Sequence, residues 1–188
     1  EDVDAQLQMT VSAYRNYLEA EPNGYVPPHG AISEDVIPYL KKNGFTWFTS
    51  SEEVLAKSRP MAMSTAEPYN VTVDGATVSG VFSDQFLRHR TAYLYRSYYA
   101  ANSTDDFIKY VLEKAPKNKK ESALVTVVID ADEHWMYYER DIDGKGFLNS
   151  VYRKLDKMFD GNRAILAVTM SEYIDGNRNR GIPAHKTK

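Results

Sequence analysis

The amino-acid sequence predicts an α/β fold with a mostly parallel sheet and flanking helices. Short apolar, β-branched runs alternate with amphipathic segments along the chain, and this strand and helix rhythm favours parallel pairing. The run at 124–129 is almost entirely apolar and β-branched, as is typical of a strand covered on both faces. Acidic residues at 130–133 follow directly, and ligand chemistry in such folds gathers at the carboxyl ends of the strands.

Composition limits the class of protein. With 188 residues, 43% of them hydrophobic and 26% charged, the chain is expected to form one globular domain. The net charge of −3 gives no basic footprint, so nucleic acid is not an expected partner. The absence of cysteine excludes disulfides, thiolate metal sites and a cysteine nucleophile, and leaves the compartment unknown. No apolar run approaches the ~20 residues of a membrane span.

The first quarter of the chain predicts two helices, each followed by a strand. Apolar residues at helical spacing predict a helix over 3–20, which ends before a short strand at 24–27. A second helix is expected between Ser33, a favourable N-cap, and Gly44, a favourable residue after a helix end. The next strand is expected at 45–49, because aromatic and β-branched residues are concentrated there.

The middle of the chain departs from this rhythm. Alternating residues on either side of Asp74-Gly75 predict a β-hairpin insertion near 70–83, with a sheet strand at 79–83. Thr104 is expected to cap a helix that ends before Pro116.

Two further strands and a helix are predicted towards the C-terminus. The apolar run is expected to form a strand at 124–130, and apolar residues at helical spacing indicate a helix over 147–158. A last strand is expected at 164–169. The polar segment 176–188 is expected to be a flexible tail, so the predicted single domain spans 1–175.

Carboxylates and an indole gather after the predicted strand at 124–130. Asp130, Asp132 and Glu133 could move protons in sugar chemistry, and Trp135 offers a ring face on which a sugar could stack. The alternative is a solvated acidic loop, which commonly follows a strand. The pattern alone leaves both interpretations open.

Several segments follow one another in a recognisable order. They are Pro27–Ser33 with Gly44–Trp47, Val81–Asp84 with Arg90 and Tyr95, Val127–Trp135 with Tyr137 and Tyr138, and Thr169–Tyr173. Together they resemble the catalytic domain of glycoside hydrolase family 57, the α-amylase and glucanotransferase family, which is related to polysaccharide deacetylases. The resemblance covers most of residues 3–175 and implies part of an incomplete (β/α)7 barrel.

The resemblance also implies roles for single residues. Asp130 falls where the family has its general acid, and Asp132 takes the place of a Glu. His29 stands where the family has its nucleophilic Glu, and an imidazole cannot readily form the glycosyl intermediate that retaining hydrolysis requires. The candidate catalytic residues are therefore Asp130, His29 and Asp132. The candidate carbohydrate-binding residues are Trp135, Glu133, Asp84, Trp47 and Glu172.

The family's early strands have no counterpart in this sequence, and neither has the segment that follows Ser171-Glu172. The chain therefore resembles a middle section of the domain or a degenerate relative. Because it also begins with Glu1 rather than Met, we expect it to be a piece of a longer protein, with the rest of that parent chain as a partner.

Three functions are compatible with these observations. The first is a hydrolase-like domain that acts on or binds α-glucan-type polysaccharide, weakly or without turnover because of His29, with Asp132, Glu133 or Glu172 as a substitute nucleophile or base. The second is a non-catalytic carbohydrate-binding or scaffolding domain of a larger protein. The third is a metal-dependent polysaccharide deacetylase, because Pro27–Gly30 resembles the proline-rich strand end of those enzymes.

A metal site is not expected. His29, Asp130 and His134 could supply the three protein ligands that a catalytic metal needs beside its open position. No histidine pair has helical ligand spacing, however, and a lone loop histidine is more often a surface or hydrogen-bonding residue. We therefore expect no metal and no cofactor, and we expect a polysaccharide or oligosaccharide as the partner.

Overall fold

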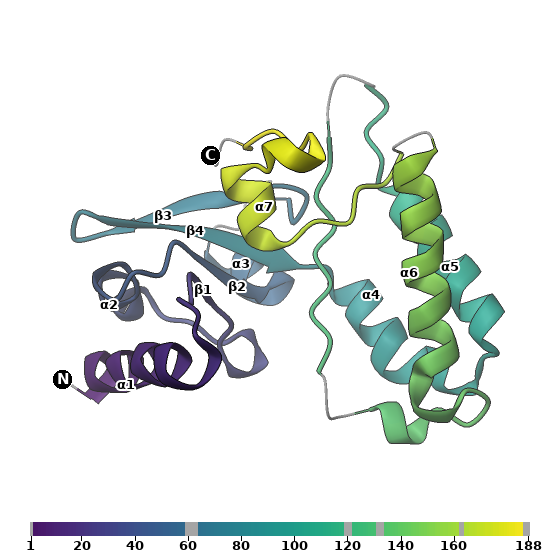
Figure 1. The fold of residues 1–188 in the computed structure, drawn as a ribbon, viewed down its shortest axis with the longest axis horizontal. Coiled ribbons are helices and arrows are strands. Elements are labelled where there is room, and N and C mark those ends of the chain that lie inside the picture. Colours follow the sequence, from purple (N-terminus) through teal and green to yellow (C-terminus); the bar gives the residue numbers. More distant parts are fainter. Residues whose placement is uncertain (1, 59–63, 119–121, 131–133, 162–163, 186–188) are drawn as a thin grey trace. The chain divides into compact units, whose positions relative to one another are not determined.

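The chain folds into two compact units. The sheet unit comprises Glu1–Phe82 and Thr169–Lys188, and the helical unit comprises Ser83–Val168. No helix in the described part of either unit is long and apolar enough to cross a bilayer. The computed structural model describes residues 2–58, 64–118, 122–130, 134–161 and 164–185 (Figure 1).

The sheet unit is built on four strands in the order β1-β2-β4-β3 (Figure 1). β1 (Gly24–Tyr25) pairs parallel to β2 (Trp47–Ser51), and β3 (Tyr69–Val73) pairs antiparallel to β4 (Ala76–Ser83). The arrows of β2 and β4 point the same way, so the sheet is mostly parallel. The predicted α/β class is therefore confirmed.

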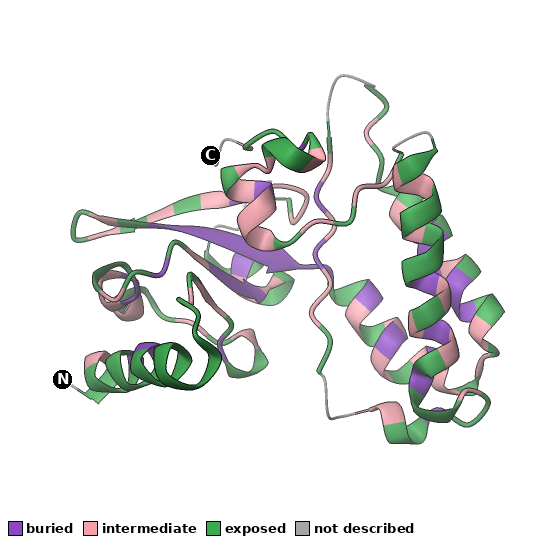
Figure 2. Cartoon of the chain, in the orientation of Figure 1, coloured by how far each residue is buried: buried purple, intermediate pink, exposed green. Residues whose placement is uncertain are grey.

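The hairpin near 70–83 is also confirmed. At its tip Asp74 and Gly75 have φ angles of 48° and 78°, and two successive positive φ values are typical of the tight turns that suit strand twist. β4 is the inner strand, and its residues 78–83 are all buried, whereas β3 alternates between half-buried and exposed positions (Figure 2). The alternation on β3 is the pattern of a strand with one covered face.

Helices α1 (Asp2–Leu18), α2 (Ile37–Lys42), α3 (Glu52–Ser58) and α7 (Met170–Asp175) belong to the same unit. Gly44 follows α2 with a φ of 88°, as expected for a glycine after a helix end. Ser33 precedes a 3-10 turn rather than α2 itself, and its side chain makes no capping hydrogen bond. Apolar side chains from α1, α2, β2 and β4 form one core, which includes Leu7, Val11, Ile37, Leu40, Phe45, Phe48, Val78 and Phe82.

The helical unit contains α4 (Gln85–His89), α5 (Ala100–Glu113) and α6 (Lys145–Asp160). Phe147 of α6 packs edge-on against Phe107 of α5, with ring centroids 6.0 Å apart, and also contacts Tyr95. Thr104 lies inside α5, where its hydroxyl donates to the Ala100 carbonyl at 2.7 Å. The prediction that Thr104 caps this helix was therefore wrong, because a threonine hydroxyl can also bond back to its own helix.

Two predicted strands, 124–130 and 164–169, are not strands. Both segments contain no regular strand, although residues 122–130 are described throughout. In that segment the Thr126 carbonyl accepts the backbone N–H of Asp84 at 2.8 Å. Apolar, β-branched residues favour an extended backbone, but a strand also needs a ladder of backbone hydrogen bonds to a neighbour, and sequence periodicity does not supply one.

The C-terminal segment has contacts of its own within the sheet unit. Asn177 and Ile182 form an isolated antiparallel bridge, and Ile182 is buried. The ring of His185 stacks on Tyr173 with centroids 3.9 Å apart. The predictions of a flexible tail at 176–188 and of a single domain over 1–175 stay predictions.

Helix α7 is fixed at its start by a capping box and to β2 by an indole. The Thr169 hydroxyl accepts the N–H of Glu172, and the Glu172 carboxylate accepts the N–H of Thr169. Arg180 donates to both carboxylate oxygens of Glu172, at 2.9 and 2.7 Å. The Ser171 hydroxyl accepts the Nε1–H of Trp47 at 3.1 Å, so residues distant in sequence meet at one hydroxyl.

We expect Gly24→Ala to destabilise the sheet unit. A Cβ at this position would lie 1.9 Å from Cζ2 of Trp47, so the indole would have to move and leave Ser171. Overpacking of this kind costs about 1–3 kcal/mol. Chemical unfolding followed by tryptophan fluorescence measures the loss. Trp47→Phe removes the clashing atoms, so adding Gly24→Ala to that variant is expected to cost much less. Equal costs in both backgrounds would contradict the clash.

We expect the stabilisation by Glu172 to vanish in acid. The backbone N–H of Thr169, with Arg180 and Asn177, lowers the pKa of Glu172 from 4.5 to about 2. Because the folded-state pKa is the lower one, the stabilisation is complete above about pH 4.5 and is lost as the pH falls towards 2. Melting temperatures of wild type and Glu172→Gln should therefore differ at pH 7, and the difference should shrink below pH 4.5 and become small only near pH 2. Glu139→Gln is the exposed control, and a gap that persisted in acid would contradict the mechanism.

Candidate active site

Asp130 ends the extended segment 122–130 and is contacted at both its backbone and its side chain. Its carbonyl oxygen accepts the Nε1–H of Trp135 at 2.8 Å. Its carboxylate Oδ2 lies 3.8 Å from Nε2 of His134. The side chain is 49% exposed, so the carboxylate is open to solvent.

His134 adopts a strained backbone conformation between Asp130 and Arg96. Its φ is 72° and its ψ is −32°, a region that costs a non-glycine residue roughly 1–2 kcal/mol. Nδ1 of its ring lies 2.9 Å from Nη2 of Arg96. A guanidinium can only donate, so Nδ1 is the acceptor and the imidazole proton lies on Nε2, the nitrogen that faces Asp130.

Two tyrosines enclose the guanidinium of Arg96. Its Cζ lies 4.9 Å from the ring centroid of Tyr93 and 4.7 Å from that of Tyr137, both within cation-π range. The ring of Tyr93 also contacts His134, with centroids 5.3 Å apart. Both tyrosines are exposed. We call Tyr93, Arg96, His134 and Tyr137 the aromatic cluster.

The hollow beside Asp130 is small. Its volume is about 10 Å³, which is room for about one water molecule. The indole of Trp135 packs against Tyr138 and so closely on Gly144 that a Cβ there would lie 2.4 Å from its ring. A sugar would therefore lie over this surface rather than inside it. The hollow is lined by Arg88, Thr91, Ala92, Val128, Ile129, Asp130, His134 and Trp135.

Asp84, a candidate carbohydrate-binding residue, is buried and caps α4. Its Oδ1 accepts the N–H of Leu87 at 2.9 Å, and its Oδ2 accepts the hydroxyl of Tyr110 at 2.9 Å. Lys114 approaches the same Oδ2 at 3.5 Å. Both carboxylate oxygens are engaged within the helical unit, so the role of Asp84 in sugar binding stays a prediction without support from these contacts.

The candidate residues of the sheet unit have different surroundings. His29 is exposed in the turn after β1, with a φ of 54°. The carbonyl of the next residue, Gly30, accepts the hydroxyl of Ser50 at 2.5 Å. Trp47 and Glu172 are both engaged at the start of α7, through Ser171 and Arg180 respectively.

The predicted site residues are divided between the two units. Asp130, Trp135 and Asp84 belong to the helical unit, whereas His29, Trp47 and Glu172 belong to the sheet unit. Asp132 and Glu133 lie outside the described residues. The roles of all these residues stay predictions.

Sequence reasoning missed the aromatic cluster. The dense run of arginines and tyrosines between residues 88 and 99 is the available signal, and such a run is also typical of a half-buried helix face. The cluster depends on the contact between Arg96 and His134, which lie 38 residues apart, and no local sequence pattern encodes that contact.

Few side chains that could bind a metal lie close together in the described part of the chain. No group of three or more His, Asp or Glu side chains there is arranged to hold an ion. Asp130 and His134 supply two donors in the helical unit, and His29 belongs to the sheet unit.

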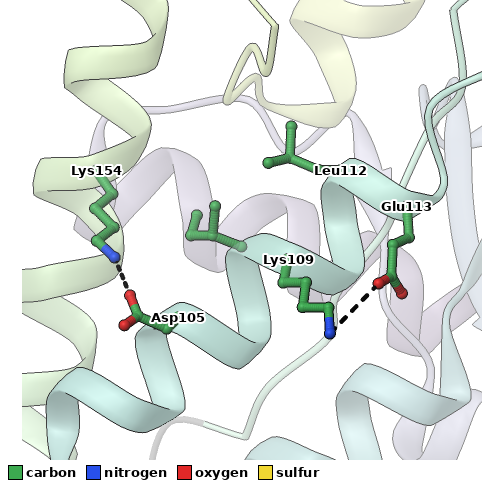
Figure 3. Close-up of a pocket in the computed structure, with 6 residues that line it drawn as sticks. Asp105, Lys109, Leu112, Glu113 and Lys154 are labelled. Atoms are coloured by element: carbon green, nitrogen blue, oxygen red, sulfur yellow. Dashed lines mark hydrogen bonds and ion pairs between the residues drawn. The ribbon is translucent and has the colours of Figure 1, made fainter.

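A larger groove lies on α5 and α6 of the helical unit (Figure 3). Its volume is about 550 Å³, and Ile108 and Leu112 contribute its apolar lining. Its charged side chains form ion pairs, Asp105 with Lys154 and Lys109 with Glu113. Both carboxylates are solvent-exposed and paired with lysines, whereas the side chain near the Asp130 carboxylate is a histidine.

Solved structures share this fold. A 4-α-glucanotransferase from Thermococcus litoralis matches with a TM-score of 0.69 and 17% identity over 93% of this chain and 25% of that one. A family 57-type branching enzyme from Pyrococcus horikoshii matches with a TM-score of 0.68 and 16% identity over 92% of this chain and 41% of that one. A putative polysaccharide deacetylase from Mycobacterium smegmatis matches with a TM-score of 0.61 and 12% identity over 98% of this chain and 59% of that one.

These likenesses confirm the predicted relation to a family 57 barrel-type fold. The chain spans between about a quarter and three fifths of the length of these three proteins. No curated protein sequence matches the chain significantly. The family model of glycosyl hydrolase family 57 matches residues 1–186, nearly the whole sequence. The chain therefore belongs to glycosyl hydrolase family 57.

Proposed function

We propose that this chain recognises α-glucan-type polysaccharide at the surface around Asp130, with weak hydrolysis or none. The observation that carries this proposal is a solvent-open carboxylate beside a cluster of exposed aromatic rings in a family 57 chain. The expectation of weak hydrolysis rests on the resemblance, which implies that His29 stands at the nucleophile position. Aromatic ring faces and a few polar groups are the usual elements of a sugar site.

Asp130 has the surroundings of a proton donor. Its carboxylate is about half exposed, so a glycosidic oxygen could approach it, and its backbone is held by the indole of Trp135. A general acid must lie within hydrogen-bond reach of the atom that it protonates. Because the hollow beside Asp130 is too small for a sugar, the substrate would approach the carboxylate from its solvent-exposed side.

A second carboxylate is the missing element. Retaining hydrolysis needs a nucleophile about 5–5.5 Å from the acid, and the family resemblance places His29 at that position. Glu172 is a poor substitute, because Arg180 and the capping box engage both of its oxygens. Hydrolysis is therefore expected to be weak even where sugar binding survives.

The alternatives are a non-catalytic carbohydrate-binding or scaffolding domain and a metal-dependent deacetylase. The first is favoured by the short span that the chain covers in the related enzymes, because walls of a substrate cleft could come from the rest of a parent chain. The second is favoured by the likeness to the putative deacetylase and by the Asp130 and His134 pair. Zinc-dependent release of acetate from an acetylated polysaccharide would select the deacetylase.

We expect the purified chain to bind α-glucan and to hydrolyse it very slowly. Loss of one member of a catalytic unit costs roughly 10⁴-fold or more in rate. Affinity electrophoresis in gels containing amylose measures binding, and release of reducing ends from maltoheptaose measures hydrolysis. Asp130→Asn should abolish any residual hydrolysis and retain binding, with Asp156→Asn as an exposed control on α6. Rapid hydrolysis that depends on Asp130 would contradict the missing nucleophile.

We expect His29→Glu to raise hydrolysis if His29 occupies the nucleophile position. The substitution restores the carboxylate that a glycosyl intermediate requires, and exposure of His29 makes it tolerable to the fold. His29→Gln is the matched control, because it has similar size and no carboxylate. A rise with Glu and none with Gln supports the assignment. An equal response of both variants, in the full parent chain as well, would contradict it.

A further inference from the structure

We propose that Arg96 and His134 form a positioning relay for Asp130. In this relay Arg96 fixes the imidazole tautomer, and the Nε2–H of His134 holds Oδ2 of Asp130, which leaves Oδ1 free for the substrate. The relay rests on the proposed role of Asp130 as the acid. His134 keeps its proton throughout and transfers none.

The first step is that the guanidinium of Arg96 is fixed independently of His134. The Nε–H of Arg96 donates to the Ala92 carbonyl at 2.5 Å, and the backbone carbonyl of Arg96 accepts the N–H of Glu139 at 2.8 Å. The rings of Tyr93 and Tyr137 pack on the guanidinium, with their centroids 4.9 and 4.7 Å from its Cζ. Arg96 is therefore held in place before any ligand arrives, which is the requirement for a positioning group.

The second step is that this contact decides which nitrogen of His134 carries the proton. Arg96 has no acceptor, so Nδ1 must accept its N–H and the proton must lie on Nε2. Nε2 is also the nitrogen that faces the Asp130 carboxylate. The contact with Arg96 therefore places the N–H of His134 on the nitrogen that faces Asp130.

The third step is that the contact with Asp130 can tighten. The present separation of 3.8 Å is longer than a hydrogen bond, and catalytic hydrogen bonds often shorten only when substrate is bound. Asp130 is the more exposed partner, so its carboxylate can rotate towards the fixed ring. Among the residues that the structure describes, Arg96, Tyr93 and Arg88 also lie near His134, and the ring of His89 contacts that of Tyr93 with centroids 5.1 Å apart.

The fourth step is the backbone strain at His134. Its φ of 72° would be relaxed in glycine, so the fold alone does not favour histidine there. A histidine held in this strained conformation points to a role for its ring. His134→Gly is accordingly expected to unfold at the same temperature as wild type or higher, which separates the relay from a structural role.

The tautomer is measured first, without any sugar. Long-range ¹H–¹⁵N NMR spectra of the full chain distinguish the two nitrogens of each of its four histidines. We expect His134 as the Nε2–H tautomer, a mixture of tautomers in Arg96→Met, and a changed Nε2–H resonance in Asp130→Ala. His185 of the sheet unit is the internal control. An Nδ1–H tautomer in wild type, or a resonance indifferent to Asp130→Ala, overturns the relay.

The kinetic arm separates positioning of an acid from general damage. Maltosyl fluoride has a leaving group that needs no protonation, whereas a maltooligosaccharide does need it. His134→Asn places its amide near Nδ1 and is expected to slow the oligosaccharide about tenfold and leave the fluoride unchanged. His134→Gln, whose amide can reach the place of Nε2, should restore most of the rate, and His89→Gln is the control. Equal losses on both substrates overturn the relay. A chain with the expected tautomer that neither binds nor cleaves glucan instead overturns the proposed function.

Discussion

The helical unit depends on the buried carboxylate of Asp84. This one residue caps α4 through Leu87, accepts the hydroxyl of Tyr110 on α5, and donates its backbone N–H to Thr126 of the extended segment that ends at Asp130. Burial of a charge is costly unless hydrogen bonds and an opposite charge compensate it, and Lys114 at 3.5 Å supplies that charge. The candidate residue Asp130 thus ends a segment that Asp84 binds through the Thr126 carbonyl.

Around Asp130 the structure concentrates polar and aromatic contacts on a strained turn. Trp135 holds the backbone of Asp130, and His134 approaches its carboxylate from a left-handed backbone conformation. Strain of this kind persists only where the surroundings determine it, and here the surroundings are Arg96 with its two tyrosines. The hollow beside these contacts has a volume of about 10 Å³, which is too small for a sugar ring.

The sheet unit employs its candidate groups in a different way. The carboxylate of Glu172 and the indole of Trp47 both serve the start of α7, one through Arg180 and the other through Ser171. A carboxylate with both oxygens bound to arginine is stabilised in its charged form and is poorly available for attack on a sugar. The chain thus belongs to family 57, and Glu172, one potential nucleophile, is engaged in the fold.

The sequence by itself determined the α/β class, the hairpin and most helices, because these follow from short-range physics. Asp74-Gly75 predicts a tight turn since both residues tolerate positive φ, and the apolar period of α1 is visible within its own residues. Only the tertiary structure decided that 124–130 is extended without a strand ladder, that Thr104 lies within a helix, and that Asp84 and Glu172 act as caps. Each of those outcomes, and the meeting of Arg96 with His134, depends on which partner occupies a hydrogen-bond position. Trp47 and Ser171, for example, are hydrogen-bonded but lie 124 residues apart in the chain, and a local sequence pattern cannot predict such a contact.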